Sequence, residues 1–196
     1  AHCVGTTISK PYFQRRVLPF SGKVKTVLYA GRLAAEKNVW SLLEAAKEFP
    51  EQTFLIAGEG PERKALQAEA KTLPNVKLLG WLPRSRLLTQ IDEADIIVLP
   101  SFIESFGTAA LEGMARGRLV IVSHHCGILE WPELVEGLYI INENENLAAA
   151  LKRINQEDFS VRKKKALAAY HLTRTMNDRT LAHWLDILKD NGNTNA

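Results

Sequence analysis

The sequence predicts an α/β domain in which a parallel sheet is covered by helices on both faces. Short runs of branched apolar residues, such as the one at 96–99, alternate along the chain with longer segments whose apolar residues recur at helical spacing. The short runs are continuously apolar, which is typical of strands that are buried on both faces. Strands that alternate with helices form parallel sheets, because each helix carries the chain back across one face of the sheet.

The predicted elements follow one another at regular intervals. Six strands are expected, at residues 26–30, 53–57, 76–79, 96–99, 119–123 and 138–141. Five helices are expected among them, at residues 39–48, 62–72, 84–93, 108–116 and 145–155. Gly117 is placed to end the fourth helix, since glycine readily adopts the left-handed conformation. The segment from about 160 to 190 has no strand pattern, and we expect two further helices there.

Length and composition are those of an ordinary globular protein. The 196 residues suffice for one good core, and 46% of them are apolar while 24% are charged. The net charge of +3 is too small to indicate a nucleic-acid partner, and no apolar run approaches the roughly 20 residues that span a bilayer. Two cysteines, Cys3 and Cys126, are too few for a disulfide framework, so we expect both as thiols in a reducing compartment.

The most informative stretch joins the strand expected at 96–99 to the next helix. It reads Glu104-Ser-Phe-Gly-Thr-Ala-Ala-Leu-Glu112, so that two carboxylates flank a strand-to-helix loop. In open α/β sheets ligands bind at the carboxyl ends of the strands, and a helix amino terminus there offers unpaired N–H groups to a phosphate. Thr108 and Glu112 share a helical face, which turns Glu112 toward the helix start. Phosphate between two carboxylates suggests a sugar nucleotide.

Two carboxylates at this spacing around Ser-Phe-Gly resemble the E-x7-E motif of the group 1 (family 4) retaining glycosyltransferases. Other blocks stand in the family's order: Gly31-Arg-Leu-Ala-Ala-Glu-Lys-Asn38, Phe54-Leu-Ile-Ala-Gly-Glu-Gly-Pro61, Val76-Lys-Leu-Leu-Gly-Trp81 and Ala94-Asp95. The resemblance covers about residues 24–154. It implies a Rossmann-like three-layer α/β/α domain with a six-stranded parallel sheet, which is one half of the GT-B architecture, followed by carboxyl-terminal helices.

The resemblance also implies a division of the chain. Residues 1–22 would be a linker remnant from a missing amino-terminal domain, because the chain starts at Ala1 without an initiator Met and the family's enzymes have two domains. Residues 23–157 would form the Rossmann-like domain that binds the nucleotide sugar. Residues 158–196 would form carboxyl-terminal helices, which in the family return toward the amino-terminal half.

By the same resemblance, the donor site has catalytic and binding residues. Glu104 would face the donor sugar, while Arg32 and Lys37 would stabilise the diphosphate leaving group, the guanidinium by a bidentate grip and the ammonium as a point charge. The donor-binding residues would be Gly31, Gly58, Gly60, Gly80, Trp81, Leu82, Phe106, Gly107, Thr108 and Glu112. Among them Glu112 would accept hydrogen bonds from the ribose, and the N–H groups of residues 106–108 would surround a phosphate.

The family reaction transfers a sugar from a nucleotide diphosphate donor to an acceptor hydroxyl with retention of configuration at the anomeric carbon. Here the donor would be a UDP- or GDP-sugar. The reaction would belong to glycan, lipid or polysaccharide biosynthesis. The expected partners are the nucleotide sugar, the missing amino-terminal domain and an acceptor glycan or lipid, without nucleic acid or cofactor. Because the acceptor site belongs to the missing domain, we expect this half to bind donor but to transfer little or no sugar. The expected location is cytoplasmic, and peripheral contact with the inner membrane face stays open.

Two alternative functions are kept. A sugar-nucleotide epimerase would share the sheet and the carboxylates, although the order of the motifs argues against it. A non-catalytic binding module derived from the same fold is the other alternative, because Cys126-Gly127 stands where the family usually has Gly-Gly. The four charged residues Arg32, Lys37, Glu104 and Glu112 argue against such decay.

Three clusters receive less specific interpretations. His124-His125-Cys126 contains zinc-ligand types, but adjacent strand residues point in alternating directions and no second ligand pair follows at metal spacing. Asp92 and Asp95 flank the start of a buried strand, and enzymes of the GT-B architecture typically lack a dedicated metal site, so we expect no metal. The basic run at 162–165 is expected to be a solvated helix face.

Overall fold

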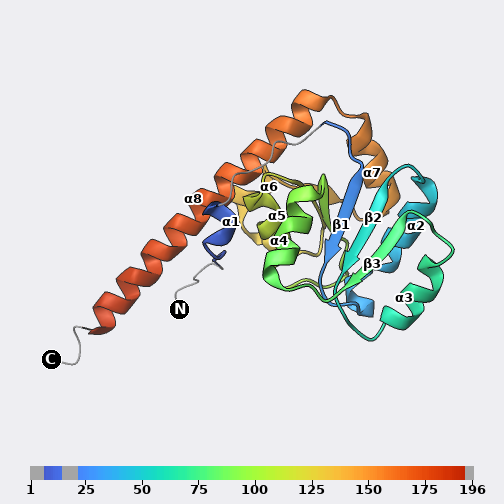
Figure 1. Ribbon diagram of the computed structural model, residues 1–196. Helices are drawn as coiled ribbons and strands as arrows, with labels where there is room; N and C mark the ends of the chain where they lie inside the picture. Colours follow the sequence, from blue (N-terminus) through green and yellow to red (C-terminus); the bar gives the residue numbers. More distant parts are fainter. Residues whose placement is uncertain (1–6, 15–21, 193–196) are drawn as a thin grey trace.

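A parallel sheet stands between two layers of helices, and one long helix extends beyond this body (Figure 1). The computed structural model describes residues 7–14 and 22–192. The strands are β1 (Thr26–Ala30), β2 (Thr53–Ala57), β3 (Val76–Gly80), β4 (Ile96–Leu99), β5 (Leu119–Ser123) and β6 (Tyr139–Ile141). The predicted six-stranded parallel sheet is confirmed.

The strand order fixes where a ligand can bind. The strands lie in the order β3-β2-β1-β4-β5-β6, with every neighbouring pair parallel. The chain therefore winds outward from β1 in one direction and from β4 in the other. Where the direction of winding reverses, the loops after β1 and β4 separate and leave a crevice at the carboxyl ends of these strands.

The five helices expected between the strands are present. They are α2 (Trp40–Glu48), α3 (Arg63–Ala70), α4 (Arg84–Glu93), α5 (Thr108–Ala115) and α7 (Leu147–Gln156). Gly117 follows α5 with a φ of 61°, and the N–H of Arg118 donates to the carbonyl of Gly113 at 3.0 Å. Gly117 therefore ends this helix in the left-handed conformation, as predicted.

Other elements differ from the expectation. The sequence did not predict the short helices α1 (Pro11–Gln14) and α6 (Pro132–Val135) or the 3-10 turns η1 (Ala35–Lys37) and η2 (Gly127–Glu130). The two helices expected from about 160 to 190 are a single helix, α8 (Phe159–Gly192). No proline or glycine occurs between Phe159 and Asn191, so nothing in the sequence interrupts this helix.

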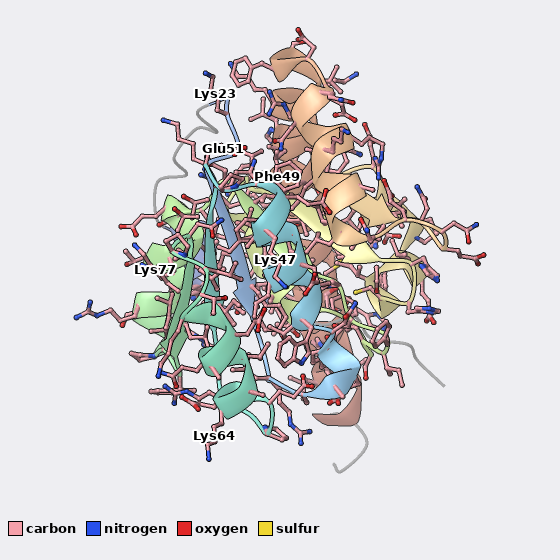
Figure 2. The ribbon with its side chains drawn as sticks, turned by 90° about the vertical axis from the view of Figure 1, so that its right-hand side faces the viewer. Lys23, Lys47, Phe49, Glu51, Lys64 and Lys77 are labelled. Carbon is pink, nitrogen blue, oxygen red and sulfur yellow. The ribbon has the colours of Figure 1, made fainter. Side chains whose placement is uncertain are left out.

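Burial on both faces of the sheet explains why the strands read as continuous apolar runs. Val27 and Tyr29 pack with α2 and α7 on one face, while Leu28 between them packs with α4 and α5 on the other. On the outside of the first layer, shown in Figure 2, Lys47 of α2 forms ion pairs with Glu44 at 3.0 Å and Glu69 of α3 at 3.1 Å. The helix layers thus present charged outer surfaces and apolar inner ones.

A buried ion pair joins three helices on the second face. The Arg116 side chain, which is 0% exposed, donates from Nε to Asp92 of α4 at 2.7 Å. Its Nη1 donates to the backbone carbonyl of Tyr12 in α1 at 2.8 Å. Residue 116 directly follows α5, so one guanidinium connects α1, α4 and the end of α5. Removal of either charge would leave the other buried without its ionic partner.

We expect Asp92→Ala to lower the free energy of unfolding by about 3–5 kcal/mol, because it leaves the Arg116 guanidinium uncompensated in the core. The double variant Asp92→Ala with Arg116→Met should recover part of that loss, since methionine needs no partner there. Urea unfolding measures both changes. The matched control is Asp186→Ala, which breaks an exposed pair with Lys189 and should change stability by less than about 1 kcal/mol. Equal effects of the two single substitutions would contradict the structural role of the buried pair.

Candidate functional site

The loops after β1, β2 and β3 touch one another through their backbones. The N–H of Gly31 donates to the carbonyl of Ala57 at 3.0 Å, and the N–H of Gly58 donates to the carbonyl of Gly80 at 2.8 Å. Gly58 has a φ of 144°, and a Cβ built there would lie 1.8 Å from the carbonyl oxygen of Gly31. Only glycine fits at this position, because any side chain would push the first two loops apart.

The next turn of the second loop repeats this close approach. A Cβ at Gly60 would lie 2.2 Å from the carbonyl oxygen of Leu33, whose own N–H donates to the carbonyl of Glu59 at 2.9 Å. Gly60 therefore supports the loop that carries Arg32 and does not itself line the crevice. The Glu59 carboxylate accepts from Arg63 at 2.5 Å and from the N–H of Trp81 at 3.3 Å, which ties the third loop to the second.

A cavity of about 420 Å³ opens over these loops, at the crevice between β1 and β4. Seven of the residues that the sequence assigned to the site line it: Gly31, Arg32, Gly58, Trp81, Leu82, Thr108 and Glu112. Five further lining residues were not predicted: Ala30, Ala57, Glu59, Leu87 and Ala109. The other six assigned residues, Lys37, Gly60, Gly80, Glu104, Phe106 and Gly107, lie outside the lining.

Glu112 provides a half-buried carboxylate in the cavity. It lies on α5 one turn after Thr108, so that the two side chains share a face as the spacing indicates. Burial raises the pKa of the Glu112 carboxyl, and the nearby Tyr12 hydroxyl and Arg84 guanidinium lower it in part. The Tyr12 hydroxyl is buried and makes no hydrogen bond of standard geometry within the described residues. Tyr12 and Arg84 belong to no motif, and only the fold brings them to Glu112.

Arg32 provides an exposed cation in the cavity lining. Its side chain is 66% exposed and forms a long ion pair of 3.8 Å with Glu36. The backbone carbonyl of Arg32 accepts a hydrogen bond from the hydroxyl of buried Tyr29 at 2.7 Å. The backbone at this position is therefore anchored, while the guanidinium can turn toward a ligand in the cavity.

Lys37 and Glu104 form an ion pair beside the cavity. Lys37 Nζ donates to Glu104 Oε2 at 2.8 Å and to the carbonyl of Ile103 at 3.2 Å. The two side chains are 20% and 19% exposed, so that solvent screens them only in part. An ammonium has three donors, and these contacts leave one of them for a ligand.

The amino terminus of α5 carries unpaired backbone donors. Within the described part of the chain, the N–H groups of Phe106, Gly107 and Thr108 make no hydrogen bond to a backbone or side-chain acceptor. Gly107 has a φ of 93°, which turns the chain into the helix. These are the three N–H groups that the sequence assigned to a phosphate.

The loop after β5 holds the α5 loop in place. The N–H of Gly127 donates to the carbonyl of Glu104 at 2.9 Å, and a Cβ at Gly127 would lie 1.9 Å from the carbonyl oxygen of Ser105. Cys126 lies beneath Gly107, where an added Cβ would come within 2.8 Å of its Sγ. Burial raises the pKa of the Cys126 thiol to about 11, and the residue is a free cysteine as expected. Cys3 lies outside the described residues.

The candidate metal ligands have other partners. Asp95 accepts from the N–H groups of Lys25 and Thr26 at 2.8 and 3.0 Å, and Asp92 pairs with Arg116. His124 Nδ1 lies 3.3 Å from the carbonyl oxygen of Ile141. Over residues 7–14 and 22–192, no three side chains of the ligand types gather in one place. The expectation of a site without metal stays a prediction.

The basic run at 162–165 is only partly a solvated helix face. Arg162 is buried, and Lys165 donates to the carbonyl of Glu136 at 2.9 Å with its Nζ 4.8 Å from the ring centre of Tyr139. The expectation was therefore wrong for these two positions, because α8 packs this face against the loop before β6. No helix in the described ranges is long and apolar enough to cross a membrane.

Comparisons with known proteins agree on one family. The family described as "Glycosyl transferases group 1" matches residues 12–171. A glycogen synthase of Mycobacterium tuberculosis is 30% identical over 183 residues, which are 88% of this chain and 43% of that protein. A 2-deoxystreptamine N-acetyl-D-glucosaminyltransferase of Niallia circulans is 29% identical over 76% of this chain and 45% of its own length. The chain thus spans less than half of these relatives.

Solved structures share the fold. Sucrose-phosphate synthase from Thermosynechococcus elongatus superimposes with a TM-score of 0.75 at 22% identity, over 90% of this chain and 47% of that one. TarM of S. aureus, in a G117R mutant, gives a TM-score of 0.76 at 19% identity, over 94% of this chain and 38% of its own. Both matches support the Rossmann-like half of the GT-B architecture that the sequence predicted.

We expect Gly58→Ala to lower the free energy of unfolding by more than about 1 kcal/mol, because the new methyl group meets a backbone carbonyl and the φ is unfavourable. Gly80→Ala is the matched control, since its φ of 69° is also unfavourable while its Cβ would meet the end of the Glu59 side chain at 3.2 Å and not a backbone carbonyl. Thermal unfolding of the two variants measures the difference in stability. A Gly58→Ala protein as stable as Gly80→Ala would show that the loops can separate at little cost.

We expect Glu112→Gln to raise the free energy of unfolding at neutral pH. The pKa of Glu112 is raised in the folded chain, so folding favours the protonated carboxyl and the ionised form is destabilising above that pKa. Glutamine cannot ionise, so its advantage is full at neutral pH and disappears as the pH falls below the unfolded-state pKa. Urea unfolding of Glu112→Gln and of the wild type, from neutral pH to below the unfolded-state pKa, measures this difference in the free energy of unfolding. Exposed Glu48→Gln is the control. An advantage that grows on acidification would contradict the assigned shift.

Proposed function

The chain belongs to the group 1 glycosyltransferases, and from this membership we propose that it is the donor-binding half of an enzyme that uses a nucleotide diphosphate sugar. The observation that carries the proposal is the composition of the cavity at the crevice between β1 and β4. The cavity combines a half-buried carboxylate, Glu112, with an exposed guanidinium, Arg32, and lies at the amino terminus of α5. A nucleotide diphosphate has hydroxyls and negative charges that match these groups.

Glu112 is the proposed acceptor for the ribose hydroxyls. A carboxylate offers several lone pairs, and two neighbouring hydroxyls can donate to it together. Because burial partly desolvates the carboxylate, a hydrogen bond from the ligand would stabilise its ionised form. The same desolvation that costs stability in the free chain therefore favours binding.

The diphosphate is proposed to lie between the amino terminus of α5 and the two cations. Unpaired N–H groups of residues 106–108 and the helix dipole favour an anion at this point. Arg32 would grip it bidentately, and Lys37 would use the donor that its pair with Glu104 leaves free. This arrangement places positive charge where the leaving group becomes more negative.

The base is proposed to lie along Gly80, Trp81 and Leu82. Trp81 lines the cavity with a side chain that is 71% exposed, which leaves the indole available for stacking. A solved structure of Anabaena HepE, described as a complex with UDP and glucose, has a TM-score of 0.65 at 22% identity. That likeness makes uridine the base to test first, with guanosine second.

In the proposed reaction, the bond between the anomeric carbon and the diphosphate oxygen breaks, and its electron pair stays on the diphosphate. The acceptor oxygen forms the new bond to the anomeric carbon on the same face, and its proton is released together with the nucleotide diphosphate. Glu104, beside Lys37, would support the sugar hydroxyls or the developing positive charge. The acceptor would be a glycan or lipid hydroxyl bound by the other half of the enzyme.

The domain limits fit this proposal. Residues 23–157 would be the donor domain, 1–22 a linker remnant and 158–196 a connection to the amino-terminal half. The carboxyl-terminal part of α8 extends beyond the body (Figure 1) and exposes Leu181, Trp184, Leu185 and Leu188 at helical spacing. An apolar stripe of this kind suits a contact with that half. We place the enzyme in the cytoplasm, because the free thiol of Cys126 is compatible with a reducing compartment.

We expect calorimetric titration of UDP or GDP into the chain to show saturable binding that Glu112→Gln and Arg32→Ala each weaken by about 1–3 kcal/mol, the contribution of a charged hydrogen bond. Arg86→Ala, an exposed arginine outside the cavity lining, is the matched control and should leave the affinity unchanged. Unchanged affinity in both site variants would refute the assignments.

The same titration separates the alternatives. A non-catalytic module predicts no nucleotide binding to the wild-type chain at all. An epimerase would isomerise the sugar of a bound nucleotide sugar without any acceptor, which nuclear magnetic resonance of the recovered donor would detect. Binding without isomerisation supports the transferase.

A further inference from the structure

A second cavity opens at the other half of the same sheet edge. It has a volume of about 390 Å³ and lies at the carboxyl ends of β4, β5 and β6, between the starts of α2 and α7. Its walls are residues 100–102, 123–125, 141–143 and 145–147, together with Asn38 and Ser41. It shares no lining residue with the first cavity. The proposed donor site leaves it unused.

The lining of this cavity is polar without a basic residue. Amides come from Asn38, Asn142 and Asn146, hydroxyls from Ser41, Ser101 and Ser123, imidazoles from His124 and His125, and carboxylates from Glu143 and Glu145. No lysine or arginine lines the cavity, and its two carboxylates carry negative charge. A phosphate or a nucleotide would be repelled, whereas a neutral molecule rich in hydroxyls would find both donors and acceptors.

Several of these polar groups have hydrogen-bond donors or acceptors that their contacts in the described residues do not use. Ser101 is 1% exposed, and its buried hydroxyl has no hydrogen-bond partner within the described residues. Asn38 uses its amide nitrogen to donate to the carbonyl of Pro100 at 3.1 Å, which leaves its side-chain oxygen as an acceptor. Asn146 uses its side-chain oxygen to accept from the N–H of Ala149 at 2.8 Å, which leaves its two N–H donors.

A backbone contact also orients the imidazole of His124. Its Nδ1 lies 3.3 Å from the carbonyl oxygen of Ile141, so that in the neutral ring Nδ1 carries the proton and Nε2 is an acceptor. The Glu145 carboxylate forms an ion pair with Arg153 at 2.9 Å, whereas Glu143 is exposed. The cavity therefore holds fixed donors and acceptors on several sides.

An apolar surface completes the lining. Phe102 is 58% exposed at the cavity rim, where it makes no ring contact within the described residues. Pro100, Ile141 and Leu147 add smaller apolar areas. A pyranose ring has an apolar face of C–H groups and an edge of hydroxyls, and a mixed lining of aromatic and neutral polar groups matches both.

We propose that this second cavity is a binding site for a neutral saccharide, with room for a single hexose unit. The proposal does not depend on the donor site, because the two linings share no residue and the second contains no lysine or arginine. A saccharide bound here would lie at the same edge of the sheet as the nucleotide. The site would therefore hold one unit of a glycan near the sugar donor.

The test is calorimetric titration of methyl α-glucoside, methyl α-mannoside and maltotriose into the chain, with and without saturating UDP. We expect saturable binding of at least one sugar in both conditions. Asn142→Trp should abolish it, because residue 142 is exposed at the cavity and the indole fills the volume. His125→Ala should weaken it by about ten-fold, through the loss of contacts with the imidazole.

His171→Ala, an exposed histidine on α8, is the matched control and should bind the sugar as the wild type does. Thermal unfolding of each variant shows whether it folds. Absence of saturable binding for all three sugars, or equal affinity in the folded Asn142→Trp variant, would overturn the proposal. Sugar binding that UDP displaces would assign the sugar to the first cavity and would also overturn it. Glucose 6-phosphate should bind more weakly than methyl α-glucoside, and tighter binding would contradict the neutral site.

Discussion

The close packing of backbones at the carboxyl ends of β1, β2 and β3 is the constraint on which the candidate site depends. Gly58 donates to Gly80 and touches the carbonyl of Gly31 so closely that no side chain fits between them. These two contacts hold the three loops together, and the first cavity opens over them. Arg32 and Trp81 belong to these loops, so their positions depend on the glycine contacts as well as on the backbone bonds that Tyr29 and Glu59 make to them.

Charges are distributed according to burial. The Arg116–Asp92 pair lies in the core and joins α1 to α4 and α5, and on the same side of the sheet Tyr12 approaches Glu112. Partial burial of Glu112 raises its pKa, which lowers stability at neutral pH because the ionised carboxylate is partly removed from solvent. The proposed ligand would donate hydrogen bonds to this carboxylate. A binding residue that is unfavourable for the free chain is what a stability–function compromise predicts.

The two cavities differ in the cations that line them. The first holds the guanidinium of Arg32 beside the carboxylates of Glu59 and Glu112 and a helix amino terminus, while the second has amides, hydroxyls and carboxylates without a lysine or arginine. The Lys37–Glu104 pair joins η1 to the loop after β4, and Asn38, which follows η1, lines the second cavity together with residues 100–102 of that loop. The proposed nucleotide and saccharide would therefore meet different donors at the two places.

The sequence by itself determined the six strands, the parallel sheet and the family, because burial on both faces produces apolar runs and close backbone contacts demand glycine at fixed spacings. It also predicted seven of the residues that line the first cavity. Only the tertiary structure decided that Tyr12 approaches Glu112, that Cys126 supports Gly107 and that the second cavity exists. These contacts join residues distant in the chain, and local patterns report a residue's immediate neighbours and burial but not its partners across the fold.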